Sequence, residues 1–184
     1  FPMKPFLFCE KQIKDLVQKQ LNKISKKPKI GITWSSKRMV YGSDKSVNLD
    51  ILKPILEINT FDFINLQYGD TSKEIEEFQK LSNIKIHKVE NIDLFDDFES
   101  IAALLKNLDL FITVSNSTAH LAGALGVPTF LIKPKSHSVF FYWNVPGSKT
   151  PWYPSIKLFE FKGNWENTIN NILIELNSNF KFTL

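Results

Sequence analysis

Residues 108–132 read LDLFITVSNSTAHLAGALGVPTFLI, and this stretch decides the fold class. A strongly apolar run ends at Val114, a turn carries Ser115 and Asn116, and a segment of small residues with helical character follows. A second apolar run begins at Val127. Nearly continuous apolar runs are typical of strands buried on both faces of a parallel sheet. We therefore read the stretch as strand, helix and strand.

The same alternation extends along the whole chain. Strands that alternate with helices indicate parallel pairing through right-handed crossovers, with helices covering both faces of the sheet. The expected fold class is α/β, doubly wound, with a mainly parallel sheet. The expected helices cover residues 10–25, 49–58, 71–82, 96–107, 117–125 and 164–177, and the expected strands cover residues 29–34, 61–67, 84–89, 108–114, 127–133 and 155–161.

Length and composition favour one globular domain and exclude several classes of protein. The 184 residues are 43% hydrophobic, which is enough for one buried core. The 23 Lys and Arg and the 19 Asp and Glu give a net charge of +4. This positive charge suits an anionic ligand but is too small to indicate a nucleic-acid-binding protein. No apolar run reaches the roughly 20 residues of a transmembrane helix. The single cysteine, Cys9, allows no internal disulfide, so we expect a cytoplasmic protein.

Four polar residues open the segment after Val114, and they are the first candidates for a ligand site. Ser115, Asn116, Ser117 and Thr118 stand where a strand ends and a helix begins, which is where doubly wound sheets bind ligands. Unpaired amides and the helix dipole favour an anion such as phosphate there. The alternative is a helix cap without a ligand, since capping alone selects these residue types.

His120 lies one turn into the same helix. No cysteine, serine motif or second histidine nearby completes a catalytic dyad. We therefore assign His120 to support of the phosphate-binding turn and not to proton transfer.

A second polar loop follows the first expected strand. Within residues 35–46, the charges of Lys37, Arg38 and Lys45 stand among hydroxyls that include Ser46, a composition suited to phosphate oxygens. The alternative is a solvated surface loop, which is common for lysine-rich segments.

Two further segments at strand ends are weaker candidates. After residues 61–67, the chain offers Gln67, Tyr68 and Gly69, where an aromatic ring or a backbone edge could meet a nucleobase; Tyr68 could equally pack in a turn. Acidic residues open the helix of residues 96–107, where capping is the favoured interpretation and hydrogen bonds to ribose hydroxyls are the alternative. These residues are Asp96, Asp97 and Glu99.

The segment of residues 133–154 is rich in proline and aromatic residues and fits either a structural plug or a lid that faces a sugar. A nicotinamide dehydrogenase is disfavoured, because the first strand is followed by GITWSSKR and not by GxGxxG. Three scattered histidines and one cysteine give no cluster with the spacing of metal ligands, so we expect no metal.

The order of these segments resembles a known family. KIGITW, LQYGD, SNSTAHLAGALGVPT and TPWYPSIKLFEF together look like the carboxyl-terminal half of glycosyltransferases of the lipopolysaccharide heptosyltransferase type. The likeness is greatest to the glycosyltransferase domains that follow tetratricopeptide repeats in bacterial proteins. It covers the chain from about Lys29 onward.

The resemblance implies the GT-B architecture, in which two Rossmann-like domains face each other and the carboxyl-terminal one holds a nucleotide-sugar donor. It implies metal-independent transfer without a cofactor, an interdomain linker and helix over residues 1–28 and a donor-binding domain over residues 29–184. Residues 115–120 would hold the diphosphate, and residues 67–69 would lie near the base. The catalytic residues are not assigned.

Two departures from the family limit what the resemblance implies. Many relatives carry an aspartate where this chain has Ser115, so the resemblance does not fix the donor or the activity. The amino-terminal acceptor domain is absent, so we expect a piece of a longer protein that binds a donor but transfers little by itself. The alternative is a degenerate domain that binds other proteins through its aromatic segment, at Tyr142, Trp143, Trp152 and Tyr153.

Overall fold

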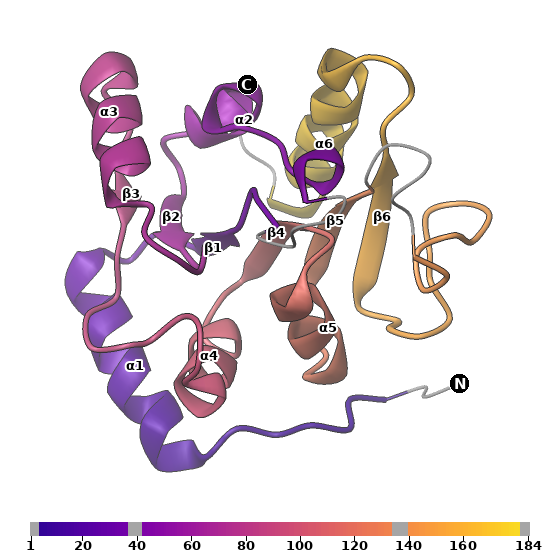
Figure 1. Cartoon of the computed structure of the whole chain (residues 1–184). Coiled ribbons are helices and arrows are strands. Elements are labelled where there is room, and N and C mark those ends of the chain that lie inside the picture. The colour runs from indigo at the N-terminus through magenta and orange to yellow at the C-terminus, as the bar shows by residue number, and fades with distance from the viewer. Residues whose placement is uncertain (1–3, 37–41, 134–139, 181–184) are drawn as a thin grey trace.

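The computed structural model describes residues 4–36, 42–133 and 140–180. Its centre is a six-stranded sheet in the order β3-β2-β1-β4-β5-β6, in which every neighbouring pair is parallel (Figure 1). This sheet confirms the predicted fold class. The strands are β1 (Lys29–Ile32), β2 (Asp62–Asn65), β3 (Ile86–His87), β4 (Leu110–Val114), β5 (Thr129–Lys133) and β6 (Ile156–Glu160).

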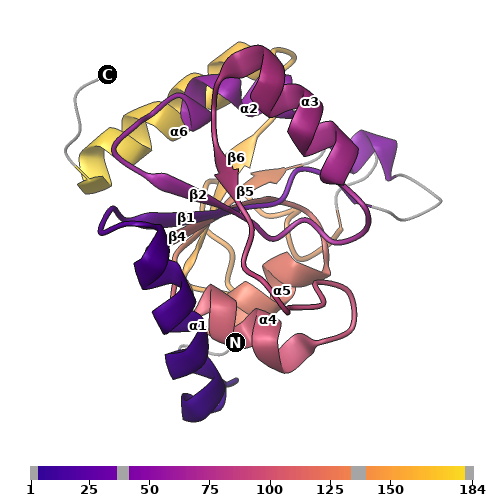
Figure 2. The ribbon, with the colours of Figure 1, turned by 90° about the vertical axis from the view of Figure 1, so that its left-hand side faces the viewer.

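Helices cover both faces of the sheet. Figure 2 shows α2, α3 and α6 above the sheet and α1, α4 and α5 below it. The α-helices are α1 (Lys11–Ile24), α2 (Leu49–Leu56), α3 (Ser72–Ser82), α4 (Phe98–Leu105), α5 (Ser117–Ala124) and α6 (Trp165–Phe180), and the 3-10 turn η1 spans Ser43–Lys45.

Each face of the sheet has its own hydrophobic core, because successive side chains of a strand point to opposite faces. In β4, Ile112 joins the core under α2 and α6, whereas Phe111 joins the core over α1 and α4. Gly31 of β1 lies where a Cβ atom would stand 2.4 Å from the Leu108 side chain. The glycine therefore lets the α1 and α4 layer pack closely on the middle of the sheet.

Helix α1 packs on the body of the domain. Its residues Val17 and Leu21 are buried in the same core as Leu104 and Leu105 of α4. The division of the chain at residue 28 stays a prediction, but the contacts place α1 in one of the two helical layers. In the described ranges, no helix combines the length and the apolar character that crossing a membrane requires.

Between β5 and β6, the described residues 140–155 form an irregular aromatic segment. Trp143 is fully buried with Leu131 and Leu158. The backbone also covers part of the sheet edge, since the amide of Leu158 donates to the carbonyl of Ser148 at 2.8 Å. The segment is thus a structural plug at the β6 edge, as one of the two sequence interpretations proposed.

A buried ion pair joins the amino ends of the neighbouring strands β1 and β2. The ammonium of Lys29 lies 2.7 Å from the Asp62 carboxylate, and both side chains are 8% exposed. Lys29 also donates to the carbonyls of Ser25 and Lys27, and the Ser25 hydroxyl donates to Asp62. Burial opposes ionisation of Asp62, but the hydrogen bonds from Lys29 and Ser25 outweigh it, so the pKa of Asp62 lies below its usual value.

Candidate functional site

The candidate site begins where β1 and β4 lie side by side, at the point where the strand order reverses. Connections from these two strands run to opposite sides of the sheet, which opens a crevice at their carboxyl ends. A buried hydrogen-bond network crosses this point: the hydroxyls of Thr33 and Thr113 lie 2.6 Å apart, and the Asn116 amide donates to Thr33 at 2.9 Å. The network fixes the loop that leads into α5 to the strand next to it.

Asn116 is the N-cap of α5. Its side-chain oxygen accepts from the amide of Ala119 at 3.0 Å, while its side-chain nitrogen is used by Thr33. The sequence predicted a helix cap as an alternative role for residues 115–118, and in the structure the cap is Asn116. Ser117 is exposed at the first position of the helix. The first-turn amides have no partner inside a helix, so this end can receive an anion.

A cavity of about 230 Å³ opens at the start of α5. It brings together six of the residues predicted from sequence, from three separate segments of the chain. The ammonium of Lys45, which lies on η1, stands 3.4 Å from the ring centroid of Phe140. Lys45 is only 3% exposed, so its charge is held close to the cavity. The lining residues are Ser36, Lys45, Tyr68, Ser115, Asn116, Ser117, His120 and Phe140.

Ser115 has a structural partner that the sequence did not reveal. The indole N–H of Trp143 donates to the Ser115 hydroxyl at 3.0 Å, and both side chains are buried. This bond ties the aromatic segment to the turn before α5. From the sequence, Trp143 could be recognised only as part of an aromatic segment, because nothing local links two residues 28 positions apart.

His120 lines the cavity and is half-buried. Burial lowers the pKa of His120, and the nearby Lys45 ammonium lowers it further. The ring is therefore neutral near pH 7, because even the ordinary pKa of histidine, about 6.5, lies below that pH. A neutral imidazole can donate one hydrogen bond to an anion, whereas Lys45 supplies the positive charge.

Three other predicted residues lie outside the lining of this cavity, although Thr118 and Gln67 line cavities next to it. The Gln67 side-chain oxygen accepts from the amides of Trp34 and Ser35 at 2.9 and 2.8 Å, so it joins the loop after β2 to the loop after β1. The Ser46 hydroxyl accepts from the amide of Ser36. Thr118 is buried next to the cap. The predicted residues Lys37 and Arg38 lie outside the described ranges.

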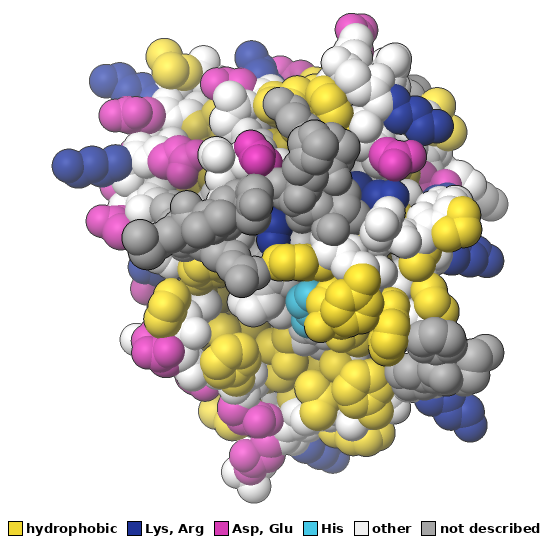
Figure 3. All heavy atoms as spheres, turned by 45° about the vertical axis from the view of Figure 1, so that its right-hand side comes forward, with side chains coloured by type: hydrophobic (Ala, Val, Ile, Leu, Met, Phe, Trp, Pro, Cys, Tyr) yellow, Lys and Arg dark blue, Asp and Glu magenta, His cyan; other side chains and the backbone are white. Residues whose placement is uncertain are grey.

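A second, more apolar cavity of about 390 Å³ adjoins the first and shares Tyr68 and Ser117 with it. Its walls include Leu94, Phe95 and Leu121. The rings of Tyr68 and Phe95 lie with centroids 6.1 Å apart, and Phe95 is 62% exposed. Figure 3 shows apolar side chains gathered over the lower half of this face. The arrangement offers a flat apolar molecule a place beside the start of α5.

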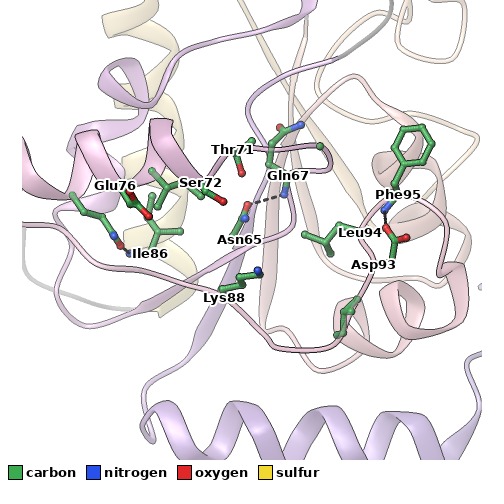
Figure 4. Close-up of a pocket in the computed structure, with 14 residues that line it drawn as sticks. Asn65, Gln67, Thr71, Ser72, Glu76, Ile86, Lys88, Asp93, Leu94 and Phe95 are labelled. Carbon is green, nitrogen blue, oxygen red and sulfur yellow. Dashed lines mark hydrogen bonds between the residues drawn. The ribbon is translucent and has the colours of Figure 1, made fainter.

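A third cavity of about 580 Å³ continues past Leu94 and Phe95 to the carboxyl ends of β2 and β3 (Figure 4). It is more polar and includes Gly69, which has a φ of 85°. Thr71 and Ser72, labelled in Figure 4, stand at the start of α3, and Lys88 directly follows β3. The three cavities form a row along the carboxyl ends of the strands, each sharing lining residues with the next.

The acidic residues at the start of α4 differ in what they contact. Asp97 caps the helix, with its carboxylate accepting from the Ser100 amide at 3.0 Å, and hydrogen bonds from Ser100 lower the pKa of Asp97. Glu99 accepts from the amide of Glu10. These contacts support the capping interpretation for Asp97, whereas Asp96 lines the second cavity.

Comparison with known proteins gives one relative in sequence. The chain is 35% identical over 161 residues to Protein FlbA of Caulobacter vibrioides, which covers 85% of this chain and 26% of that protein. The chain thus spans about a quarter of that relative's length. No protein-family model matches the chain.

Solved structures give a clear likeness in fold. The E. coli ADP-heptose LPS heptosyltransferase II has a TM-score of 0.67 at 14% identity, covering 97% of this chain and 55% of that one. The E. coli heptosyltransferase WaaC with ADP has a TM-score of 0.55 at 14% identity, covering 97% of this chain and 51% of that one. The chain therefore has the Rossmann-like fold of GT-B glycosyltransferases, and it spans about half the length of these two enzymes.

Proposed function

We propose that the chain is the nucleotide-sugar-binding domain of a glycosyltransferase. The observation that carries this proposal is the first cavity, which joins Lys45, His120 and the start of α5 and opens into the apolar cavity beside Tyr68. One end of this pair of cavities suits an anion, and the other suits a flat ring. A nucleoside diphosphate has both parts.

The diphosphate would lie at the start of α5. The first-turn amides and the helix dipole attract negative charge, and the Lys45 ammonium adds a full positive charge in a largely buried place. The same groups would stabilise the diphosphate as it leaves the sugar, because that is when negative charge develops on it. Transfer would thus need no metal ion.

The base would lie in the apolar cavity between Tyr68 and the residues before α4. Tyr68 and Phe95 offer aromatic faces, and Leu121 of α5 closes the side next to the diphosphate. Aromatic rings bind flat ligands by offset stacking and by removing apolar surface from water. Gly69 and the polar third cavity would receive the outer edge of the base and its ribose.

Transfer would require a second, amino-terminal domain that binds the acceptor and supplies the catalytic base. This part of the proposal rests on length, since the chain spans 55% of the heptosyltransferase II chain and 26% of FlbA. We propose that the parent protein is bacterial and cytoplasmic and places tetratricopeptide repeats near this domain.

A protein-binding scaffold is the second candidate. It is favoured by the bond between Trp143 and Ser115, which occupies a residue of the predicted turn, and by Phe141, which is 61% exposed on the aromatic segment. A scaffold would bind no nucleotide.

The K45M substitution is expected to weaken binding of ADP and UDP by about ten- to a hundredfold, since a hydrogen bond to a charged group is worth about 1.5–3 kcal/mol. Isothermal titration calorimetry with EDTA present measures the affinity and tests whether a metal ion is needed. K85M is the matched control, because Lys85 is an exposed lysine at the amino end of the edge strand β3, whereas the cavity lies at the carboxyl ends of the central strands β1 and β4. Equal affinities for K45M and K85M would place the ligand elsewhere, and a wild-type chain that binds neither nucleotide would favour the scaffold.

A further inference from the structure

The imidazole of His120 is held on three sides by the aromatic segment. Its Nδ1 atom lies 3.2 Å from the hydroxyl of Tyr153. Its ring stacks on Trp143, with centroids 4.9 Å apart and planes 29° apart, and meets Tyr142 edge-on at 4.8 Å. One nitrogen of the ring is thus engaged by protein, which leaves Nε2 for a ligand in the cavity.

Tyr153 is itself seated against α5. A Cβ atom at Gly123 would stand 2.4 Å from Cγ of the Tyr153 ring, so the absence of a side chain at this position lets the ring lie on the helix. Gly123 follows His120 by three residues, and residues three apart lie on the same face of a helix. The glycine therefore brings the tyrosine hydroxyl to the level of the histidine ring.

We propose that Tyr153 is a positioning residue that sets the tautomer of His120. The Tyr153 hydroxyl donates to Nδ1, which places the imidazole proton on Nε2. An N–H at Nε2 donates to an anionic oxygen in the cavity, whereas the other tautomer would present a lone pair and repel it. The tautomer part of this inference stands by itself, and its effect on affinity rests on the proposed function.

The groups around His120 keep its ring neutral, so the position of its single proton determines whether Nε2 can donate a hydrogen bond. Burial and the Lys45 ammonium both lower the pKa of His120, so the ring carries a single proton near neutral pH. Burial and the neighbouring Tyr142 raise the pKa of Tyr153, so its hydroxyl keeps the proton that it donates. Among residues 4–36, 42–133 and 140–180, the ionisable groups around the ring are Lys45 from η1, Tyr142 and Tyr153 from the aromatic segment, and Tyr68 across the cavity.

The Y153F substitution removes only the hydroxyl and keeps the ring seated on Gly123. In the wild-type chain, long-range ¹H–¹⁵N NMR spectra are expected to show His120 with its proton on Nε2. In Y153F the two tautomers should mix, and the affinity for ADP or UDP should fall by roughly three- to tenfold, as expected for one lost hydrogen bond. An H120N sample identifies the signals of His120 among those of the three histidines.

The matched control is Y142F, because Tyr142 contacts the His120 ring by its edge and its hydroxyl has no bond to the ring nitrogen. Y142F should keep both the tautomer and the affinity. Unchanged His120 spectra in Y153F, or the same change in Y142F, would overturn the inference. If the tautomer changes in Y153F but the wild-type chain binds neither ADP nor UDP, the positioning role stands and the proposed function fails.

Discussion

The K29M substitution is expected to lower the free energy of unfolding by about 3–5 kcal/mol, the cost of breaking a buried ion pair from one side. Methionine keeps most of the stem but leaves the Asp62 carboxylate buried, with its partner at 2.7 Å removed. The carbonyls of Ser25 and Lys27 also lose their donor. Urea unfolding followed by circular dichroism measures the change.

Two variants test this explanation. The double substitution K29M/D62L should recover most of the loss, because it removes both charges together. K53M breaks the exposed pair of Lys53 and Glu57, whose side chains are 45% and 56% exposed, and should cost at most about 1 kcal/mol. If K29M costs no more than K53M, the buried pair does not stabilise the fold in the way described.

Lowering the pH should reduce the difference in the free energy of unfolding between the wild-type chain and K29M. The pKa of Asp62 is lowered in the folded state, so its stabilising contribution is complete above the unfolded value near 3.8 and is lost as pH falls through the lower folded value. In K29M the buried Asp62 carboxylate loses the Lys29 ammonium; among the described residues it keeps only the Ser25 hydroxyl and His87, whose Nε2 lies 3.8 Å away, so the folded chain gains stability once Asp62 is protonated. The two unfolding free energies should therefore converge below about pH 4.

The fold was predictable because each of its elements carries a local signal. The strand that ends at Val114 is a continuous apolar run, as a strand buried on both faces must be. The caps Asn48, Asp97 and Asn116 stand directly before their helices and accept from amides three residues later. The place of the polar turn at the carboxyl end of β4 was predictable from the topology, which puts this turn at the crevice.

The contacts that complete the candidate site were not predictable, because they join loops without periodicity. Tyr153 reaches His120 across 33 positions, and Gln67 reaches Trp34 across 33 positions. Gln67 was expected near a nucleobase from its place after a strand; it lines the third cavity, and the sequence did not reveal that two amides of the neighbouring loop donate to its side-chain oxygen. The partner of a buried polar group is set by tertiary packing, which cannot be read from residue types and their spacing in the sequence.

The N116A substitution is expected to lower the free energy of unfolding by about 2–4 kcal/mol and to weaken ADP or UDP binding at least about tenfold. The stability loss combines a lost helix cap, worth about 1 kcal/mol, with the loss of one of the two hydrogen bonds of the buried Thr33 hydroxyl, which keeps only Thr113, about 1–3 kcal/mol. Binding should suffer because the first turn of α5 would no longer be fixed to β1. Urea unfolding and calorimetric titration measure the two effects.

N48A is the matched control for N116A, since Asn48 caps α2 through the Ile51 amide in the same way but at an exposed position. It should cost about 1 kcal/mol and leave nucleotide affinity unchanged. N116D separates the two roles of Asn116, because aspartate keeps the capping oxygen but cannot donate to Thr33. We expect its stability to fall between the wild-type chain and N116A. If N116A costs only as much as N48A, or weakens no nucleotide, then Asn116 serves as a helix cap alone and the network with Thr33 does not organise the site.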